Sequence, residues 1–172
     1  MIDDDFNGYG DVKWDDSIEK IKNIYPNIRD ITEDELRKKG ILIFETETMK
    51  GVMTSKEFYF YNEKLYGVML NFNNIDFTSE NMLLNTFVNK YGKFDSEEQK
   101  KWWANDNVFV ETTVLQLSLS PKMFIAVQIA NYIDKFTKEI VFRQNKYSYF
   151  NKMIGDQIEI DYAKKNIEGI VL

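Results

Sequence analysis

Residues 57–72 read EFYFYNEKLYGVMLNF, and this stretch decides the class of fold. It contains two aromatic-rich runs, residues 57–61 and residues 65–72, on either side of the polar residues 62–64. Aromatic side chains are common in strands, and a short polar connection between two such runs is typical of a β-hairpin. The stretch therefore predicts two antiparallel strands, with Phe and Tyr alternating between a buried and a wetter face of the sheet.

Further strands are predicted on both sides of this hairpin. Before it, residues 41–47 (ILIFETE) have the composition of a strand, and residues 48–56 are expected to form a polar connection. After it, residues 108–119 and 123–130 are apolar-rich runs separated by a turn at Pro121. Successive strands joined by short turns favour an antiparallel sheet.

Capping and stop residues predict helices elsewhere in the chain. They place three helices between Asp16 and Pro26, between Thr32 and Gly40, and between Ser79 and Gly92. A fourth helix is predicted over residues 131–153, because apolar residues recur there at helical spacing. Residues 157–162 alternate apolar and polar side chains, which favours a short strand.

These elements predict an α+β class, with an antiparallel β-sheet packed by helices on one face. The length fits a single domain over residues 1–172. The element order also admits two fused ααβββ halves, residues 14–74 and 78–130, followed by a C-terminal helical extension over residues 131–172. In this pseudo-repeat, residues 95–103 would be the second helix of the second half.

The composition excludes several classes of chemistry. The net charge is −6 and no run of Lys or Arg stands out, so neither a nucleic acid nor an anionic membrane is an expected partner. The chain has no Cys and no His, which removes thiol nucleophiles, zinc–thiolate sites and the usual base near neutral pH. No apolar stretch reaches transmembrane length, so direct membrane insertion is not expected. No cofactor is predicted.

Three segments carry a resemblance to a known type of protein. They are residues 10–21 (GDVKWDDSIEKI), 60–68 (FYNEKLYGV) and 89–93 (NKYGK). They resemble small bacterial envelope proteins, namely SmpA/OmlA-like lipoproteins and the β-lactamase-inhibitor-protein fold. The resemblance implies a helix pair on an antiparallel sheet and a role in protein binding or assembly. The chain departs from these lipoproteins because it lacks a lipobox cysteine. A periplasmic or envelope location is expected if a leader was removed, and a cytoplasmic location is expected otherwise.

Five aromatic residues are the candidate binding residues. Trp102 and Trp103 are adjacent, so on a strand they would point to opposite faces and one of them would be exposed. An exposed Trp suits a protein hot spot or a sugar platform, and burial of both under a loop is the alternative. Tyr59, Tyr61 and Tyr66 are expected to form an aromatic surface on the open side of the sheet, unless a helix packs there.

Paired carboxylates are the remaining means of acid–base catalysis in this chain. Glu45 and Glu47 would share one face of a strand, and Glu111 lies on another predicted strand. A hydrolase needs two such groups in a cleft, with the pKa of one raised, and nothing in the sequence supplies that. The sequence therefore favours a non-enzymatic protein-binding or assembly module. A cryptic carboxylate-dependent hydrolase and a purely structural subunit of a larger complex are the alternatives.

One spacing resembles a calcium-binding loop. It is Asp3-x-Asp5-x-Asn7-Gly8-x-x-Asp11. Such loops end with a bidentate Glu at their twelfth position, and that position is Trp14 in this chain. No metal site is predicted.

Overall fold

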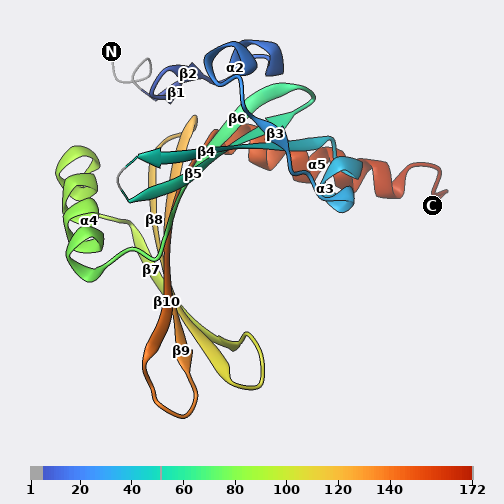
Figure 1. The fold of residues 1–172 in the computed structure, drawn as a ribbon. Helices are drawn as coiled ribbons and strands as arrows, with labels where there is room; N and C mark the ends of the chain where they lie inside the picture. The colour runs from blue at the N-terminus through green and yellow to red at the C-terminus, as the bar shows by residue number, and fades with distance from the viewer. Residues whose placement is uncertain (1–5, 51, 172) are drawn as a thin grey trace.

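The computed structural model describes residues 6–50 and 52–171, which form an α+β fold built on antiparallel strands (Figure 1). The strands are β1 (Gly8–Tyr9), β2 (Val12–Lys13), β3 (Arg29–Asp30), β4 (Ile41–Lys50), β5 (Met53–Tyr61), β6 (Lys64–Asn73), β7 (Ser96–Trp103), β8 (Val108–Ser120), β9 (Met123–Asp134) and β10 (Ile140–Phe150). Within the described residues, eight of them form one sheet in the order β3-β4-β5-β6-β10-β9-β8-β7, and β1 pairs with β2.

The hairpin predicted over residues 57–72 is confirmed. Its strands are β5 and β6, and they pair antiparallel with a register shift between Tyr59 and Phe60. Asn62 and Glu63 form the turn, with φ angles of 49° and 65°. Two successive residues with positive φ match the right-handed twist of the flanking strands. The expected polar connection over residues 48–56 is wrong, because β4 continues to Lys50 and β5 begins at Met53.

Four helices are present in the described part of the chain. They are α2 (Ile18–Ile24), α3 (Asp34–Lys38), α4 (Phe77–Tyr91) and α5 (Lys152–Ile167). The cap of α2 is Ser17, one residue after the predicted Asp16, and the cap of α4 is Asp76, which accepts hydrogen bonds from Ser79. Helix α4 ends at Gly92, as the sequence predicts, with a φ of 96°.

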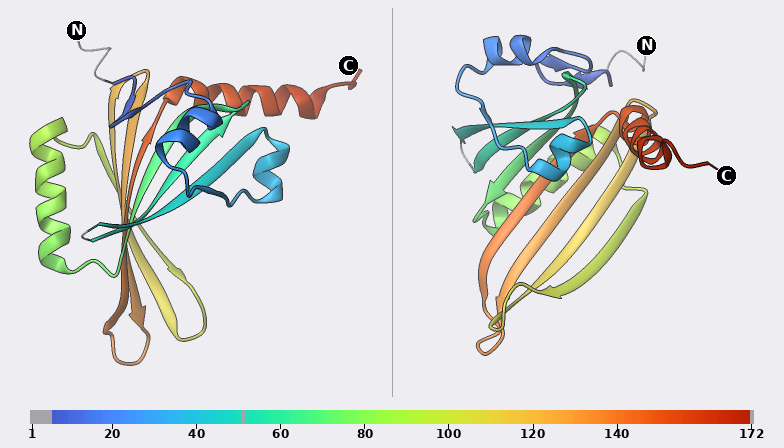
Figure 2. Two further views of the ribbon diagram at one scale, coloured as in Figure 1. Left: turned by 45° about the horizontal axis from the view of Figure 1, so that its top comes forward. Right: turned by 90° about the vertical axis from the view of Figure 1, so that its right-hand side faces the viewer.

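The two faces of the sheet carry different cores. We call the face bearing Phe58 and Phe60 the first face, and the face bearing Tyr59 and Tyr61 the second face. On the first face, α2, α4 and the β1–β2 hairpin cover a large core that includes both of these Phe side chains. On the second face, α3 and α5 cover a smaller cluster around Tyr66. Helices therefore lie against both faces of the sheet (Figure 2), whereas the sequence predicted helices on one face. The reason is that β5 carries aromatic side chains on both of its faces.

The helix predicted over residues 131–153 is wrong. Strand β9 continues to Asp134, and β10 begins at Ile140 and pairs with both β9 and β6. The Asp134 carboxylate accepts hydrogen bonds from the backbone N–H of Phe136 at 2.8 Å and of Thr137 at 2.9 Å, which closes the turn between the strands. The aromatic residues of β10 satisfy the spacing of a strand as well as that of a helix, and pairing with two neighbours favours the strand.

The C-terminal helix begins later than predicted. Residues 157–162, expected as a strand, lie inside α5, and Gly155 lies within this helix. Residues 95–103, expected as a helix of the pseudo-repeat, contain β7. The second half therefore has one helix before its strands where the first half has two. No helix of the described residues is long and apolar enough to span a membrane.

Strands β7 to β10 extend beyond the helices. Figures 1 and 2 show their two hairpin ends projecting away from α2, α4 and α5. We call residues 101–111 and 131–142 the distal tip. The backbone N–H of Lys135 donates to the carbonyl of Asn107 at 2.8 Å, so the two hairpin ends are tied to each other.

Candidate functional site

Trp102 and Trp103 lie at the end of β7, the edge strand of the sheet. Their side chains are 43% and 59% exposed. Trp103 pairs with Phe109 on the first face, and Trp102 pairs with Val110 on the second. Both indole rings are thus available at the surface, on opposite faces of one strand end.

The first face of the distal tip carries a row of apolar side chains. Trp103, Phe109, Ile133 and Ile140 follow one another across β7, β8, β9 and β10 in register. The Trp103 ring packs edge-on against Phe109 with 5.6 Å between centroids. Phe109 and Ile133 are buried in the middle of the row, whereas its two ends are exposed. The row therefore presents apolar surface to solvent beyond the reach of the helices.

The hairpin ends add further exposed apolar groups to this row. Phe136 is 74% exposed, and Val141 is exposed beside Ile140. The Lys135 ammonium lies 5.8 Å from the Trp103 centroid and 5.4 Å from the Phe136 centroid, so this one cation is close to both rings. The exposed apolar residues of the distal tip are Trp102, Trp103, Phe136, Ile140 and Val141.

Three lysines lie over the aromatic rings of the distal tip. The Lys101 and Lys138 ammonium groups lie 4.3 Å and 5.6 Å from the Phe109 centroid, and Lys135 approaches Trp103 and Phe136. These lysines form no ion pair with the described residues. A cation over a ring face is attracted to it and extends the apolar surface with its alkyl stem. The tip thus combines aromatic area with three lysines, and four carboxylates, Asp106, Glu111, Asp134 and Glu139, lie within the same residues.

Local hydrogen bonds hold both hairpin ends in place. The side-chain oxygen of Asn105 accepts from the N–H groups of Asn107 and Val108, at 2.8 Å and 3.0 Å. In the other hairpin, backbone hydrogen bonds from Thr137 and Phe136 lower the pKa of Asp134, so this carboxylate stays ionised and keeps its turn closed. The exposed rings are therefore carried by ordered turns, which reduces the entropy lost on contact with a partner.

The tyrosines proposed for an aromatic surface lie elsewhere, under α5. Tyr66 is buried, and Tyr59 packs edge-on against Phe150 with 5.0 Å between centroids. The Tyr61 hydroxyl donates to Asp161 of α5 at 2.6 Å. Burial raises the pKa of Tyr66 to about 12. The structure thus places Tyr59, Tyr61 and Tyr66 in the attachment of a helix, the arrangement that the sequence left as the alternative, and does not bring them near the tryptophans.

The candidate carboxylates do not converge. Glu45 and Glu47 share the guanidinium of Arg29, at 3.0 Å and 3.8 Å, while Glu111 lies exposed on β8. Among the described residues, no three side chains of the metal-binding types are grouped. The calcium-like spacing begins at Asp3 and Asp5, which lie outside the described residues. The arrangement of these acids does not favour the hydrolase alternative.

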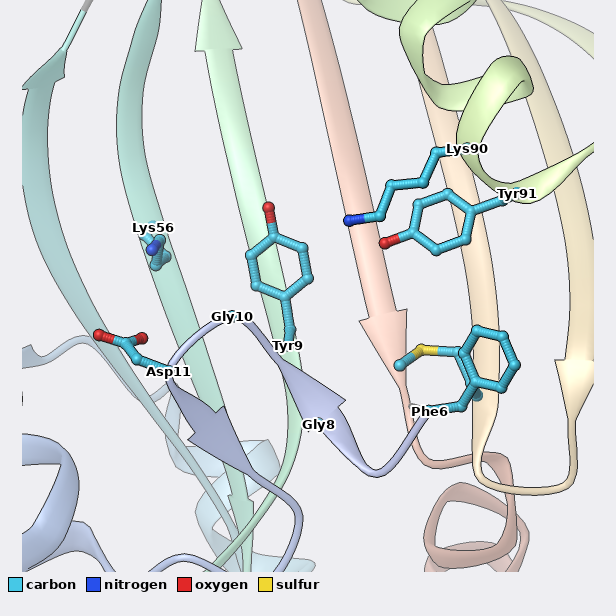
Figure 3. Close-up of a pocket in the computed structure, with 9 residues that line it drawn as sticks. Phe6, Gly8, Tyr9, Gly10, Asp11, Lys56, Lys90 and Tyr91 are labelled. Atoms are coloured by element: carbon cyan, nitrogen blue, oxygen red, sulfur yellow. The ribbon is translucent and has the colours of Figure 1, made fainter. Parts of the chain in front are cut away.

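A second region is a hollow on the first face that the sequence did not predict. It has a volume of about 670 Å³, and Figure 3 shows Lys90 and Tyr91 reaching into it from α4 toward Tyr9 and Lys56. A smaller hollow of about 190 Å³ adjoins it and shares Tyr9, Lys90 and Tyr91. Its walls include Tyr149 of β10, which the sequence assigned to a helix. The alternation of polar and aromatic side chains over residues 146–149 was the available signal.

Comparison of the chain with protein-family models, with curated proteins and with solved structures gives no match. The resemblance to SmpA/OmlA-like lipoproteins and to the β-lactamase-inhibitor-protein fold therefore stays a prediction. The functional conclusion depends on the geometry of the distal tip and of the first face.

Proposed function

We propose that the chain is a non-enzymatic protein-binding or assembly module that contacts its partner through the distal tip. The observation that carries this proposal is the exposure of Trp103 and Phe136 on tied hairpin ends that project beyond the helices. Large exposed apolar groups on an ordered surface are typical of protein interaction sites. Trp in particular is enriched among the residues that dominate binding energy.

The contact is made by side chains of the tip, and strand addition along β7 is disfavoured. The residues of β7 before its tryptophans are all exposed, and the sequence there is Ser-Glu-Glu-Gln-Lys-Lys. Charged side chains on an edge strand oppose pairing with another strand. The apolar surface begins where this charged stretch ends, at Trp102. The partner surface is expected to offer an apolar pocket that receives the exposed rings of Trp103 and Phe136.

A bacterial envelope location is part of the same proposal and is supported by the sequence resemblance alone. Fractionation of cells that express the full-length gene product tests it. Recovery with the periplasm or the envelope supports the proposal. Recovery with the cytoplasmic fraction contradicts the location and leaves the binding role to the following test.

Photo-crosslinking from two exposed positions tests the binding role. A photoreactive phenylalanine analogue at Phe136 samples the distal tip, and the same analogue at Met153, an exposed residue of α5, is the matched control. We expect a discrete protein adduct in cells from position 136 and none from position 153. The variant Trp103→Ser should remove the adduct without unfolding the chain, because this side chain is largely exposed.

Three results would contradict the proposal. Adducts of equal yield from both positions would mean that the tip has no special role. An adduct from position 136 that persists in Trp103→Ser would mean that the aromatic row does not carry the contact. Absence of any adduct would favour a chain that does not act by binding through this end.

A further inference from the structure

We propose that the hollow on the first face binds a small aromatic acid, with the carboxylate held among tyrosine hydroxyls and lysines and the ring inserted beside α4. This site is separate from the distal tip. Its residues come from β1, β5, α4 and β10, which the fold brings to one place (Figure 3).

Three tyrosines supply the first part of the argument. The Tyr9 and Tyr149 rings are 4.3 Å apart between centroids, and Tyr91 and Tyr149 are 6.2 Å apart. The hydroxyl groups of these three residues make no hydrogen bond with the described residues. Burial raises the pKa of Tyr9 and, further, that of Tyr149, so both phenols remain protonated near neutral pH. The cluster therefore offers hydrogen-bond donors that have no acceptor among the described residues, and such donors favour an anionic ligand.

Two lysines flank this cluster. The Lys90 ammonium lies 5.0 Å from the Tyr91 centroid and has no ion pair with the described residues. The Lys56 ammonium lies 5.9 Å from the Tyr9 centroid and donates to the Tyr25 hydroxyl at 3.1 Å. The two cations thus border the tyrosine rings from α4 and from β5. Of the two, the Lys90 ammonium is the cation that the site offers to an anionic ligand.

Asp11 is the carboxylate that lines the larger hollow, and it is already engaged. Its Oδ1 accepts from the Tyr25 hydroxyl at 2.9 Å, and this same hydroxyl accepts from Lys56. The chain of hydrogen bonds from Lys56 through Tyr25 to Asp11 balances one negative charge. Lys90 and the three tyrosine hydroxyls remain for a ligand.

The smaller hollow gives the ligand its apolar part. Its walls are aromatic and aliphatic, and they include Leu70, Phe72, Leu83, Phe87 and Tyr147. Aromatic side chains favour an aromatic ligand through edge-on and offset contacts. The smaller hollow shares Tyr9, Lys90 and Tyr91 with the larger one. One short molecule can therefore place its ring in the smaller hollow and its carboxylate among the tyrosine hydroxyls.

Titration calorimetry of the full chain with 3-phenylpropionate tests the site. We expect saturable binding at one site, and roughly 10-fold weaker binding of the neutral 3-phenylpropanamide, which is the loss of about one charge-assisted hydrogen bond. Acetate and inorganic phosphate should bind at least 10-fold more weakly than the aromatic acid, because they leave the apolar hollow empty. Equal binding of acid and amide, or of phosphate and the aromatic acid, would overturn the proposal.

Variants locate the binding in the hollow. Lys90→Met keeps the alkyl stem and removes the charge, and should weaken binding roughly 10-fold. Thr86→Trp places a large group from an exposed position of α4 into the smaller hollow and should abolish binding of the aromatic acid. Lys165→Met, an exposed lysine of α5 on the other face, is the control and should bind normally. Unchanged affinity in both Lys90→Met and Thr86→Trp, with native circular dichroism, would sink the proposal.

Discussion

The covered half and the distal tip belong to one sheet but are supported differently. Around β5 and β6, helices lie against both faces, and Phe58 is fully buried. At the tip, β7 to β10 continue without any helix, and Phe136 is 74% exposed. Aromatic side chains hold the structure together in the first region and are presented to solvent in the second. The difference shows that aromatic content alone does not distinguish a buried core from an exposed surface.

Local chemistry compensates for the missing helices at the tip. The covered half depends on apolar burial beneath helices, whereas the tip combines the burial of Phe109, Val110 and Ile133 with capped turns and lysines over aromatic rings. Only the first kind of support contributes a large free energy of folding. The exposed residues of the tip can therefore be substituted at little cost in stability.

The largest expected effect is the contrast between two Phe-to-Ala substitutions. Phe58→Ala removes a fully buried ring and should lower the free energy of unfolding by about 3–5 kcal/mol. Phe136→Ala removes an exposed ring and should change it by less than about 0.5 kcal/mol. Urea denaturation of both variants measures the difference. Similar losses in the two variants would mean that the tip is part of the core, and the comparison would fail.

The boundary between the two regions contains a buried ion pair. Arg143 of β10 contacts Glu80 of α4 at 3.3 Å, and Asn145 donates to the same carboxylate at 2.8 Å. Arg143→Met leaves this carboxylate buried without its cation and should lower the free energy of unfolding by about 3 kcal/mol. Chemical denaturation of Arg143→Met and of the unchanged chain measures this loss in the free energy of unfolding.

The double variant Arg143→Met with Glu80→Gln is the control for this ion pair. It removes both charges and keeps an acceptor for Asn145, so it should be more stable than Arg143→Met alone. If the double variant is instead no more stable than Arg143→Met, the unpaired charge of Glu80 does not account for the loss.

The sequence predicted the covered half better than the tip, for physical reasons. The hairpin of β5 and β6 follows from local alternation and from a short turn, and both are visible within 16 residues of sequence. Residues 131–153 satisfy two periodicities, and the choice between them depends on pairing with β6, which is distant in the chain. The same error hid Tyr149 and with it the hollow on the first face.

The tryptophan pair shows how far local reasoning reaches at the candidate site. That Trp102 and Trp103 point to opposite faces follows from the geometry of any strand. Their joint exposure does not, because it requires that β7 be the edge strand and that no helix cover its end. Both conditions belong to the order of the whole sheet.

A smaller effect on stability is expected at Gly67, where the covered half has no room for a side chain. A Cβ added to Gly67 would overlap the ring of Phe150, its cross-strand neighbour under α5. Gly67→Ala should therefore lower the free energy of unfolding by about 1–3 kcal/mol. Gly155→Ala in α5 meets no atom within 4 Å and should be neutral or stabilising by about 0.4–1 kcal/mol. Thermal unfolding of the two variants compares them, and equal losses would show that the space around Gly67 is not decisive.

The smallest expected effect concerns pH at the tip. Backbone hydrogen bonds lower the pKa of Asp134 below its usual 3.8, so its contribution to the turn is present above that value and is lost as the pH falls through the depressed pKa. Amide exchange of Phe136 and Thr137 should therefore become faster, relative to the sheet, only below about pH 4. In Asp134→Asn this acid-dependent step should be absent, whereas Asp76→Asn, at the cap of α4, should leave the step at the tip intact. If both variants retained it, a global acid transition would be acting, and the tip would not be supported by its own turn chemistry.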